Sequence, residues 1–380
     1  MKSTGKLFFI VLLILTCLYT GGTQAKAAAN YPPADPGAAE SFTDSLRKIN
    51  GKWFYFDQNG IAITKTLKQI NGNYYYFGAD GAAVTKTLKK IDGNYYYFGA
   101  DGIAITKTLK KTDGHYYYFD ADGTAVTGTL QKVDEKYYYF DSKGQAVTEK
   151  WKTINGKKYY FRKNGSAATE SCRINGKYYV FNLKGQLLTP TGRKMKKVGS
   201  EYYYINEKGQ PVTGWRVLRE KSAYSADIIY VYKNGKCARN ETVDKIKFNK
   251  NAYAINSQRV LARMAAEKFI RKCTNSSDSI SVKLKKSAQR VVATFSYTGS
   301  QRCSGFKKDD WVYRAAIEAL ATDSGDCFYI AATIGVLADA LGFENVSVIH
   351  LAKSHAYVRI GKKGNYIYYD NMGPHQFTTF

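Results

Sequence analysis

The 380-residue chain is poor in histidine, tryptophan and acidic residues, and each shortage limits the kinds of site and partner that we expect. It has 4 histidines, and no group of His, Cys and carboxylate residues has the spacing of metal ligands, so we expect neither a metal nor another cofactor. Its 31 acidic residues are outnumbered by 57 Lys and Arg residues, which gives a net charge of +26. Such an excess favours anionic partners: nucleic acid, acidic wall polymers or membrane surfaces.

Long apolar runs are also scarce, and the one that stands out is at the N-terminus. Basic residues precede the mostly apolar run Leu7–Tyr19, and small residues around Ala25 suit cleavage. We therefore predict a signal peptide over residues 1–29 and a secreted protein with no stable membrane span after cleavage. An uncleaved anchor and a lipid-bearing Cys17 are the alternatives. Export argues against a nucleic-acid partner.

Cysteine occurs only 6 times. Apart from Cys17 in the signal segment and Cys327, which is considered below, four cysteines remain, an even number that would allow two disulfides in an oxidising compartment. Cys273 and Cys303 are the first pair to test because both precede an apolar helix in one domain. Free, buried thiols are the alternative.

Tyrosine is abundant instead, with 33 copies arranged in a repeat. Turn glycines count nine units, the last ones looser, and a short unit of this kind cannot bury a face without its neighbours. After a flexible leader at residues 30–45, residues 46–239 are therefore predicted to form a β-hairpin solenoid of about nine repeats of about 20 residues each. Successive units open 21 residues apart at Leu46, Leu67, Leu88, Leu109, Leu130 and Trp151.

Each unit is predicted to be a hairpin of its own. In one unit, Tyr74–Phe77 would be a strand, Gly78–Gly81 the turn and Ala82–Thr85 the return strand. Because side chains alternate along a strand, Tyr74 and Tyr76 would share one face while the rings between and after them share the other. One face would form the solenoid core, and the other would stack on neighbours or line a groove. The alternative is that all these rings are core.

These units resemble the choline-binding and glucan-binding cell-wall repeats of secreted bacterial proteins. That family pairs a Gly-Trp opening with a Trp-Tyr-Tyr strand, and here Gly214-Trp215 keeps the opening while four other openings are Thr-Leu. In the family, rings from adjacent hairpins cage a quaternary ammonium group. The resemblance implies attachment to the bacterial cell wall through a glycopolymer of teichoic acid, choline-bearing or glucan type. It implies as ligand-binding rings Trp53, Tyr55, Tyr74, Tyr76, Tyr95, Tyr97, Tyr116, Tyr118, Trp151 and Trp215.

The last third of the chain has a different pattern. A linker is predicted near Lys233–Lys250, followed by a helix at Ser257–Arg271, a strand at Val291–Tyr297 and a helix at Asp309–Leu320. Apolar residues then recur at helical spacing over Phe328–Leu341. The sequence therefore predicts a helical region ahead of a buried helix.

Cys327 is predicted to lie in the first turn of that buried helix. Asp323 or Ser324 could cap its first turn. Free N–H groups and the positive end of the helix dipole would then favour the thiolate of Cys327, and the same N–H groups could hold an oxyanion.

A hairpin predicted after the helix brings a histidine and an aspartate together. With Lys362-Lys363 as the turn, His355 lies opposite Asp370 on the same face of the sheet. Cysteine, histidine and aspartate are the parts of a thiol nucleophile, its base and the group that orients the base, and His350 is the alternative base. Three strands are predicted here: Val346–Ile349, His355–Ile360 and Tyr366–Tyr369.

Gly325-Asp-Cys327, His355-Ala-Tyr357 and the aromatic strand that ends in Asp370 resemble the transglutaminase-like superfamily. The resemblance implies a papain-like α+β domain over residues 240–380, with Cys327 as nucleophile, His355 as general base and Asp370 as the orienting acid. It implies a cysteine hydrolase or acyl transferase that attacks amide bonds of protein or wall peptide through a thioester. The alternative is a surface adhesin or wall-binding protein whose domain is inert.

Overall fold

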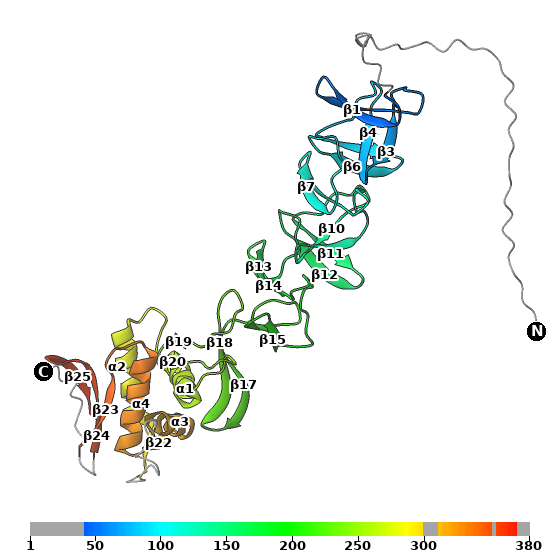
Figure 1. Ribbon diagram of the computed structural model, residues 1–380. Coiled ribbons are helices and arrows are strands. Elements are labelled where there is room, and N and C mark those ends of the chain that lie inside the picture. Colours follow the sequence, from blue (N-terminus) through cyan, green and yellow to red (C-terminus); the bar gives the residue numbers. More distant parts are fainter. Residues whose placement is uncertain (1–41, 299–310, 352–354, 371–380) are drawn as a thin grey trace, which may run out of the picture. The chain divides into compact units, whose positions relative to one another are not determined.

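The computed structural model describes residues 42–298, 311–351 and 355–370, which belong to two compact units, residues 1–126 and 127–380 (Figure 1). The predicted signal peptide, almost all of the predicted leader, and Cys303 lie outside the described residues. None of the helices in the described ranges is long and apolar enough to cross a membrane.

The first unit is a series of two-stranded antiparallel hairpins. In the part that is described, its hairpins are β1 (Ser45–Ile49) with β2 (Lys52–Phe56), β3 (Thr66–Ile70) with β4 (Asn73–Phe77), β5 (Thr87–Ile91) with β6 (Asn94–Phe98), and β7 (Thr108–Thr112) with β8 (His115–Phe119).

The second unit begins with hairpins of the same kind. They are β9 (Leu130–Val133) with β10 (Lys136–Tyr139), β11 (Lys150–Ile154) with β12 (Lys157–Phe161), β13 (Glu170–Ile174) with β14 (Lys177–Phe181), β15 (Lys194–Val198) with β16 (Glu201–Ile205), β17 (Gly214–Ser222) with β18 (Ser225–Val231), and β19 (Thr242–Val243) with β20 (Ile246–Lys247). The prediction of repeated β-hairpins is confirmed in both units.

The strands of each hairpin differ from those predicted. The aromatic strand pairs with the lysine-rich strand before it, from Ile70↔Asn73 onwards, and Ala83 contributes only an isolated bridge after the aromatic strand. The turn is Asn71-Gly72, with φ of 49° and 82°. Asn-Gly is the preferred pair for a two-residue turn in which both residues have positive φ, so it closes the hairpin there. The predicted turn at Gly78–Gly81 is also present, with the N–H of Gly81 donating to the carbonyl of Gly78 over 3.2 Å, but the return segment after it forms only one bridge and no strand.

The predicted alternation of the rings is confirmed. Tyr75 and Phe77 are buried, with 6% and 0% exposed, whereas Tyr74 and Tyr76 are half-buried. Fully burying one such apolar side chain stabilises a fold by about 1.5–3 kcal/mol. The equivalent phenylalanines of six hairpins are fully buried, namely Phe77, Phe98, Phe119, Phe140, Phe161 and Phe181, whereas Phe56 of the first hairpin is half-buried.

Within each unit, backbone hydrogen bonds join hairpins to earlier ones. The N–H of Ala83 donates to the carbonyl of Trp53 over 2.8 Å, and in the second unit the N–H of Ala167 donates to the carbonyl of Tyr137 over 2.7 Å. A single hairpin is only marginally stable in water. These bonds explain why the repeats fold as a stack.

The segment proposed as a linker contains the hairpin β19–β20. Phe248 bridges Ala254 as Phe77 bridges Ala83, and the N–H of Ala254 donates to the carbonyl of Ile228 over 2.8 Å. The repeat geometry therefore continues beyond residue 239. Hairpin β17–β18 and the following helix α1 (Ser257–Cys273) share an apolar cluster that includes Ile228, Phe248 and Val260.

Helices make up most of the rest of the second unit, with a three-stranded antiparallel sheet in the order β23-β24-β25. Helix α4 has ten buried residues, contacts the other three helices and β24, and lies between the sheet and α3 (Figure 1). The elements after α1 are α2 (Ile280–Thr294), β21 (Ser296–Tyr297), α3 (Trp311–Thr322), β22 (Ser324–Gly325), α4 (Cys327–Ala340), β23 (Ser347–Leu351), β24 (His355–Lys362) and β25 (Asn365–Tyr369).

The helix predicted at Ser257–Arg271 and the three C-terminal strands are confirmed within a few residues. The strand predicted from Val291 was wrong, because α2 continues to Thr294. Leu284, Ala288 and Val291 are buried at helical spacing, and this packing overrides the strand preference of the Val-Val pair. Only Ser296–Tyr297 is extended, and it pairs in parallel with β22.

Candidate functional site

Helix α4 begins at Cys327, so this residue lies in the first turn as predicted. The cap is Asp326, whose carboxylate accepts hydrogen bonds from the N–H groups of Phe328 (2.9 Å) and Tyr329 (3.2 Å). The predicted caps, Asp323 and Ser324, were wrong because Ser324 belongs to strand β22, which ends before the helix begins.

Gly325 allows the close passage from β22 into α4. A Cβ atom at this position would collide with the side chain of Tyr329, one turn into the helix. Any other residue would push the strand away from the helix start. In the Gly-Asp-Cys sequence, the glycine therefore leaves room for Tyr329, the aspartate caps the helix, and the cysteine is the first residue of the helix.

The thiol of Cys327 is 4% exposed. Burial raises its pKa above the ordinary value, and the neighbouring Asp326 carboxylate raises it further, while hydrogen bonds from the N–H groups of Ala356, Cys327 and Phe328 act in the opposite direction. The N–H groups at the helix start lower the pKa of the thiol as expected, but the cost of burying the charge exceeds their contribution, so the net shift of the pKa is upward.

His355 and Asp370 meet on the sheet, with 2.7 Å between Nε2 and Oδ1. The turn between β24 and β25 is Lys363-Gly364, so the strands pair from Lys362↔Asn365, two residues away from the predicted register. Continuing this register places Asp370 diagonally across from His355. The predicted direct pairing was wrong, but a shift of two residues keeps both side chains on one face.

The second ring nitrogen of His355 faces the interior. Nδ1 is buried and has no hydrogen-bond partner among the described residues, and the side chain is 12% exposed. The N–H of the next residue, Ala356, donates to the sulfur of Cys327. The start of α4 and the start of β24 therefore lie against each other, which brings Cys327 beside the backbone of the histidine.

Tyr297 is a member of this site that the sequence did not point to. Tyr297 is 62% exposed, but the partial loss of solvent around its phenol raises the pKa of that group, and so do the charges of Cys327 and Asp326 and a hydrogen bond to Cys327. Tyr297 is placed there by its parallel pairing with Gly325. The signal was weak because thirty positions separate it from the cysteine and its strand has two residues.

Three other expectations concern residues of this domain. The pairing of Cys273 with Cys303 stays a prediction because Cys303 lies outside the described residues. His350 lies on β23, and the structure does not describe its side chain. Among the described residues, no group of three or more His, Cys, Asp or Glu side chains could hold a metal ion.

The repeats offer a second candidate site on their half-buried rings. Of the ten rings proposed to bind ligand, Tyr55 is only 8% exposed and packs with Tyr75 and Phe77 in a core cluster. The other nine are half-buried. They are Trp53, Tyr74, Tyr76, Tyr95, Tyr97, Tyr116, Tyr118, Trp151 and Trp215.

The two tryptophans that open repeats pack closely against other rings. Trp151 meets Tyr160 and Tyr179 edge-on, with centroids 5.3 and 5.1 Å apart. Trp215 meets Tyr230 in the same way at 5.1 Å and stacks on Phe248 at 5.7 Å. Edge-to-face pairs at these separations are favourable on their own, so the indoles contribute to packing between hairpins.

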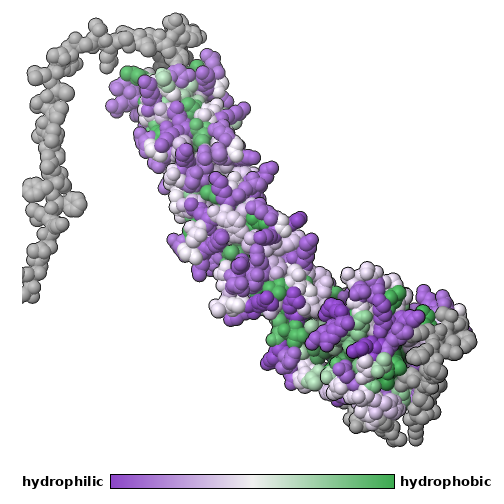
Figure 2. All heavy atoms as spheres, turned by 180° about the vertical axis from the view of Figure 1, so that it is seen from behind, coloured by the Kyte–Doolittle hydropathy of each residue, from purple (hydrophilic) through white to green (hydrophobic). Residues whose placement is uncertain are grey.

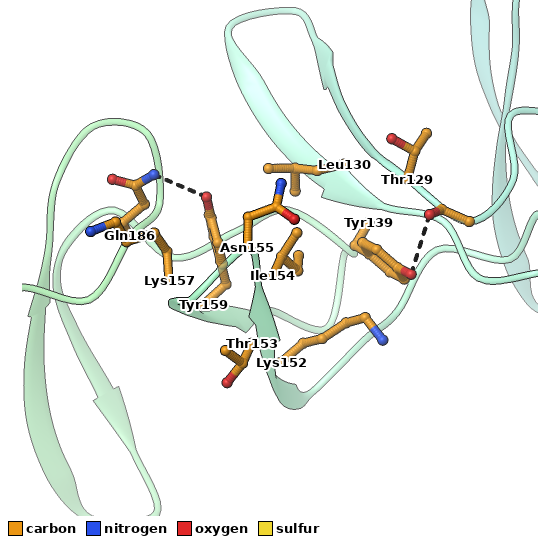
Figure 3. A pocket seen from close by; sticks show the side chains of 11 residues that line it. Thr129, Leu130, Tyr139, Lys152, Thr153, Ile154, Asn155, Lys157, Tyr159 and Gln186 are labelled. Atoms are coloured by element: carbon orange, nitrogen blue, oxygen red, sulfur yellow. Dashed lines mark hydrogen bonds between the residues drawn. The ribbon is translucent and has the colours of Figure 1, made fainter.

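A cavity of about 610 Å³ opens between hairpins of the second unit (Figure 3). The Tyr139 hydroxyl donates to the carbonyl of Gly128 over 3.4 Å, and the Gln186 amide donates to the Tyr159 hydroxyl over 3.1 Å. The ammonium of Lys152 lies 4.2 Å from the centroid of the Tyr139 ring. The cavity is lined by aromatic faces, two side-chain amides and cationic groups.

Comparisons with known proteins concern the repeats. Residues 43–88 and 84–127 match the family model “Choline-binding repeat”, and residues 129–146 and 149–167 match “Putative cell wall binding repeat”. The chain therefore carries cell-wall-binding repeats of the choline-binding type, which indicates association with the cell wall. A search of curated protein sequences found no match.

Several solved structures are similar to part of this chain. Choline-binding protein F from Streptococcus pneumoniae is 25% identical over 55% of this chain and 91% of its own, with a TM-score of 0.31. Alternansucrase in complex with isomaltononaose is 21% identical over 55% of this chain and 16% of its own, with a TM-score of 0.30. A pneumococcal cell wall endolysin from phage Cp-1, complexed with choline, is 28% identical over 35% of this chain and 37% of its own, with a TM-score of 0.23.

Proposed function

We propose that the chain is a cell-surface cysteine hydrolase or acyl transferase that acts on amide bonds of protein or wall peptide and is held at the wall by its repeats. The observation that carries the proposal is the 2.7 Å contact between His355 and Asp370, next to Cys327 at the start of α4. A histidine oriented by a carboxylate beside a thiol is the arrangement that nucleophilic catalysis requires.

Each residue then has a defined role in the attack on the amide. Nδ1 of His355 accepts the thiol proton of Cys327, while Nε2–H donates to Asp370, which stabilises the imidazolium. The raised thiol pKa makes this base necessary, because little thiolate forms without it. The sulfur attacks the amide carbon, and the negative oxygen is held by the backbone N–H of Cys327 and by the Tyr297 phenol, because the next N–H groups of α4 already donate to Asp326.

The reaction continues through a thioester. The imidazolium of His355 gives its proton to the leaving amine as the amide C–N bond breaks, and the acyl group remains on Cys327. Water that then attacks the thioester completes hydrolysis, and an amine in its place completes transfer. Both outcomes use the same residues, so the substrate that reaches the thioester decides between them.

Alkylation of Cys327 tests the proposal. The secreted protein is treated with iodoacetamide at neutral pH, and modification of the Cys327 peptide is followed by mass spectrometry. We expect Cys327 to react about tenfold or more faster in the wild type than in His355→Ala, because the imidazole removes the thiol proton. His115→Ala, on an exposed residue of the repeats, is the matched control and should leave the rate unchanged. Equal, slow rates in all three proteins would contradict the proposal.

A non-catalytic surface adhesin is the second candidate. The 4% exposure of Cys327 and the upward pKa shift caused by burial favour it, because buried structural thiols are unreactive. This candidate predicts that Cys327 reacts more slowly than the half-buried Cys172 of the repeats in the same experiment. The two candidates therefore give opposite orders of reactivity for two cysteines in one sample.

Wall attachment is tested separately on the repeats. A wall glycopolymer of teichoic acid, choline-bearing or glucan type is the proposed ligand, supported by the repeat matches over residues 43–167. The protein should be retained on purified bacterial wall, and washing with choline should release it if choline is the group recognised. If the protein is not retained, the repeats do not attach it to the wall. This outcome would not bear on the proposed chemistry of Cys327.

A further inference from the structure

A lysine covers a tyrosine face at the same place in several repeats. The lysine is the third residue of the opening strand of one hairpin, and the tyrosine is the fourth residue of the aromatic strand of the hairpin before it. The ammonium nitrogen lies 4.2 to 5.0 Å from the ring centroid in these pairs: Lys68–Tyr55 at 4.4 Å, Lys89–Tyr76 at 4.7 Å, Lys110–Tyr97 at 5.0 Å and Lys152–Tyr139 at 4.2 Å.

These distances are those of cation–π contacts, which require the cation within about 6 Å of the centroid. One face of a ring accommodates one cation. A quaternary ammonium ligand seated on the same face would have to displace the lysine of this chain. The four lysines are half-buried between hairpins, so they are held at the rings by the surrounding chain as well as by the contact itself.

The charge of these lysines is not balanced locally. None of the four forms an ion pair with a carboxylate among the described residues. The ring contact leaves ammonium N–H groups free to bind an acceptor, and phosphate oxygens are strong acceptors for such donors. Hydrophilic residues cover most of the repeat surface on the face drawn in Figure 2, so a charged polymer can approach it.

The cavity in Figure 3 shows what one such position offers. Lys152 lies over Tyr139, and Lys157 lines the same cavity of about 610 Å³ together with the amide groups of Asn155 and Gln186. Two ammonium groups and two amides suit a phosphate with a neighbouring sugar or polyol. No carboxylate lines this cavity among the described residues.

We propose that Lys68, Lys89, Lys110 and Lys152 determine the ligand of the repeats by occupying the ring faces themselves. They exclude quaternary ammonium groups and bind the phosphodiester backbone of an anionic polymer in their place. The inference rests on the proposed wall attachment and names the chemical group that the repeats recognise.

Two matched variants of the secreted protein test it. In the first, the four lysines over rings are changed together to glutamine. In the second, four exposed lysines for which the structure records no ring contact are changed to glutamine, so that the net charge falls equally: Lys65→Gln, Lys86→Gln, Lys107→Gln and Lys143→Gln. Binding to inorganic polyphosphate at constant salt, retention on a choline resin and retention on purified wall are measured for each.

We expect the wild type to bind polyphosphate and to pass through the choline resin. The ring variant should bind polyphosphate about tenfold more weakly than the control variant, and it alone should gain retention on choline, because its tyrosine faces are uncovered. The inference is overturned if both variants lose polyphosphate binding equally, or if the wild type is retained on choline as strongly as the ring variant. Failure of the wild type to bind purified wall would instead contradict the proposed attachment.

Discussion

The repeats and the C-terminal helical region bury their apolar residues in different ways. In the repeats each core cluster uses residues from two or three neighbouring hairpins, such as Tyr55, Tyr75, Phe77 and Ala83. In the C-terminal region one cluster extends from Ala262 to Ile360 and includes all four helices and the sheet.

This difference has consequences for stability and for function. A repeat array behaves as a chain of nearest-neighbour interactions, so damage in one hairpin remains local. A region with one shared core unfolds as a unit, so a destabilising substitution at any buried position also increases unfolding around Cys327. Attachment can therefore tolerate the loss of one repeat, whereas the proposed chemistry depends on the whole C-terminal core.

The largest expected effect is on the proposed activity of the C-terminal region, and it should leave wall binding by the repeats unchanged. Cys327→Ala should lower amide hydrolysis and amine incorporation at least about 1,000-fold, because the nucleophile is lost. Retention on purified wall should not change. Release of peptides from casein and incorporation of a dansylated amine into it measure the two reactions. Cys273→Ala, which also removes a thiol of the C-terminal region, should retain activity; equal activity of Cys327→Ala and the wild type would refute the proposed role.

The next effect is on the stability of the repeats. Phe119→Ala removes a fully buried ring and should destabilise its part of the array by about 3–5 kcal/mol. Hydrogen exchange should report faster opening around β8, while the alkylation rate of Cys327 stays at the wild-type value. The conservative variant Phe119→Leu should lose less. A change in Cys327 reactivity would show that the repeats and the C-terminal region are coupled more strongly than we infer.

A smaller effect is expected from overpacking the C-terminal core. A Cβ atom on Gly335 of α4 would lie 2.8 Å from Cγ2 of Val348, so Gly335→Val should cost about 1–3 kcal/mol. Urea unfolding followed by tryptophan fluorescence and by Cys327 accessibility measures it. Ala321→Val, on an exposed position of α3, is the control and should change stability by less than about 0.5 kcal/mol. Similar costs for both variants would argue against close packing of α4 on the sheet.

The smallest effect concerns pH and the buried thiol of Cys237. Burial raises the pKa of this thiol from 9.0 to about 12. Because the folded pKa lies above the unfolded one, the stability it contributes is complete below pH 9 and is lost as the pH rises towards 12. We expect a loss of about 1 kcal/mol at pH 10 that is absent in Cys237→Ala. Urea titrations at pH 8 and 10 compare the two proteins, and equal pH dependence would mean that the thiol is not buried as described.

Much of the repeat structure could be predicted from the sequence because its causes are local. The period of 21 residues and the alternation of Tyr74 and Tyr75 follow from spacing alone. The turn at Gly78–Gly81 was predicted correctly, but the turn at Asn71-Gly72 that closes the two-stranded hairpin was missed, although this pair carried the stronger signal for a turn with two positive φ values.

For the C-terminal site, the sequence predicted that His355 and Asp370 meet, but it gave the wrong strand register for them. His355 and Asp370 share a face for any even shift of register, so the contact survived an error of two residues. The cap at Asp326 and the presence of Tyr297 depend on the pairing of β21 with β22, which joins segments about thirty positions apart. Separations of this kind leave no periodic signal.

The sequence by itself determined the hairpin array and the meeting of His355 with Asp370, because both depend on residue type and on short, regular spacing. Only the tertiary structure decided that the thiol of Cys327 is buried, with a raised pKa, and that lysines cover the tyrosine faces of the repeats. Burial and cation–ring contacts arise from segments that fold against one another, and their effects on charge follow from the solvent that is excluded there.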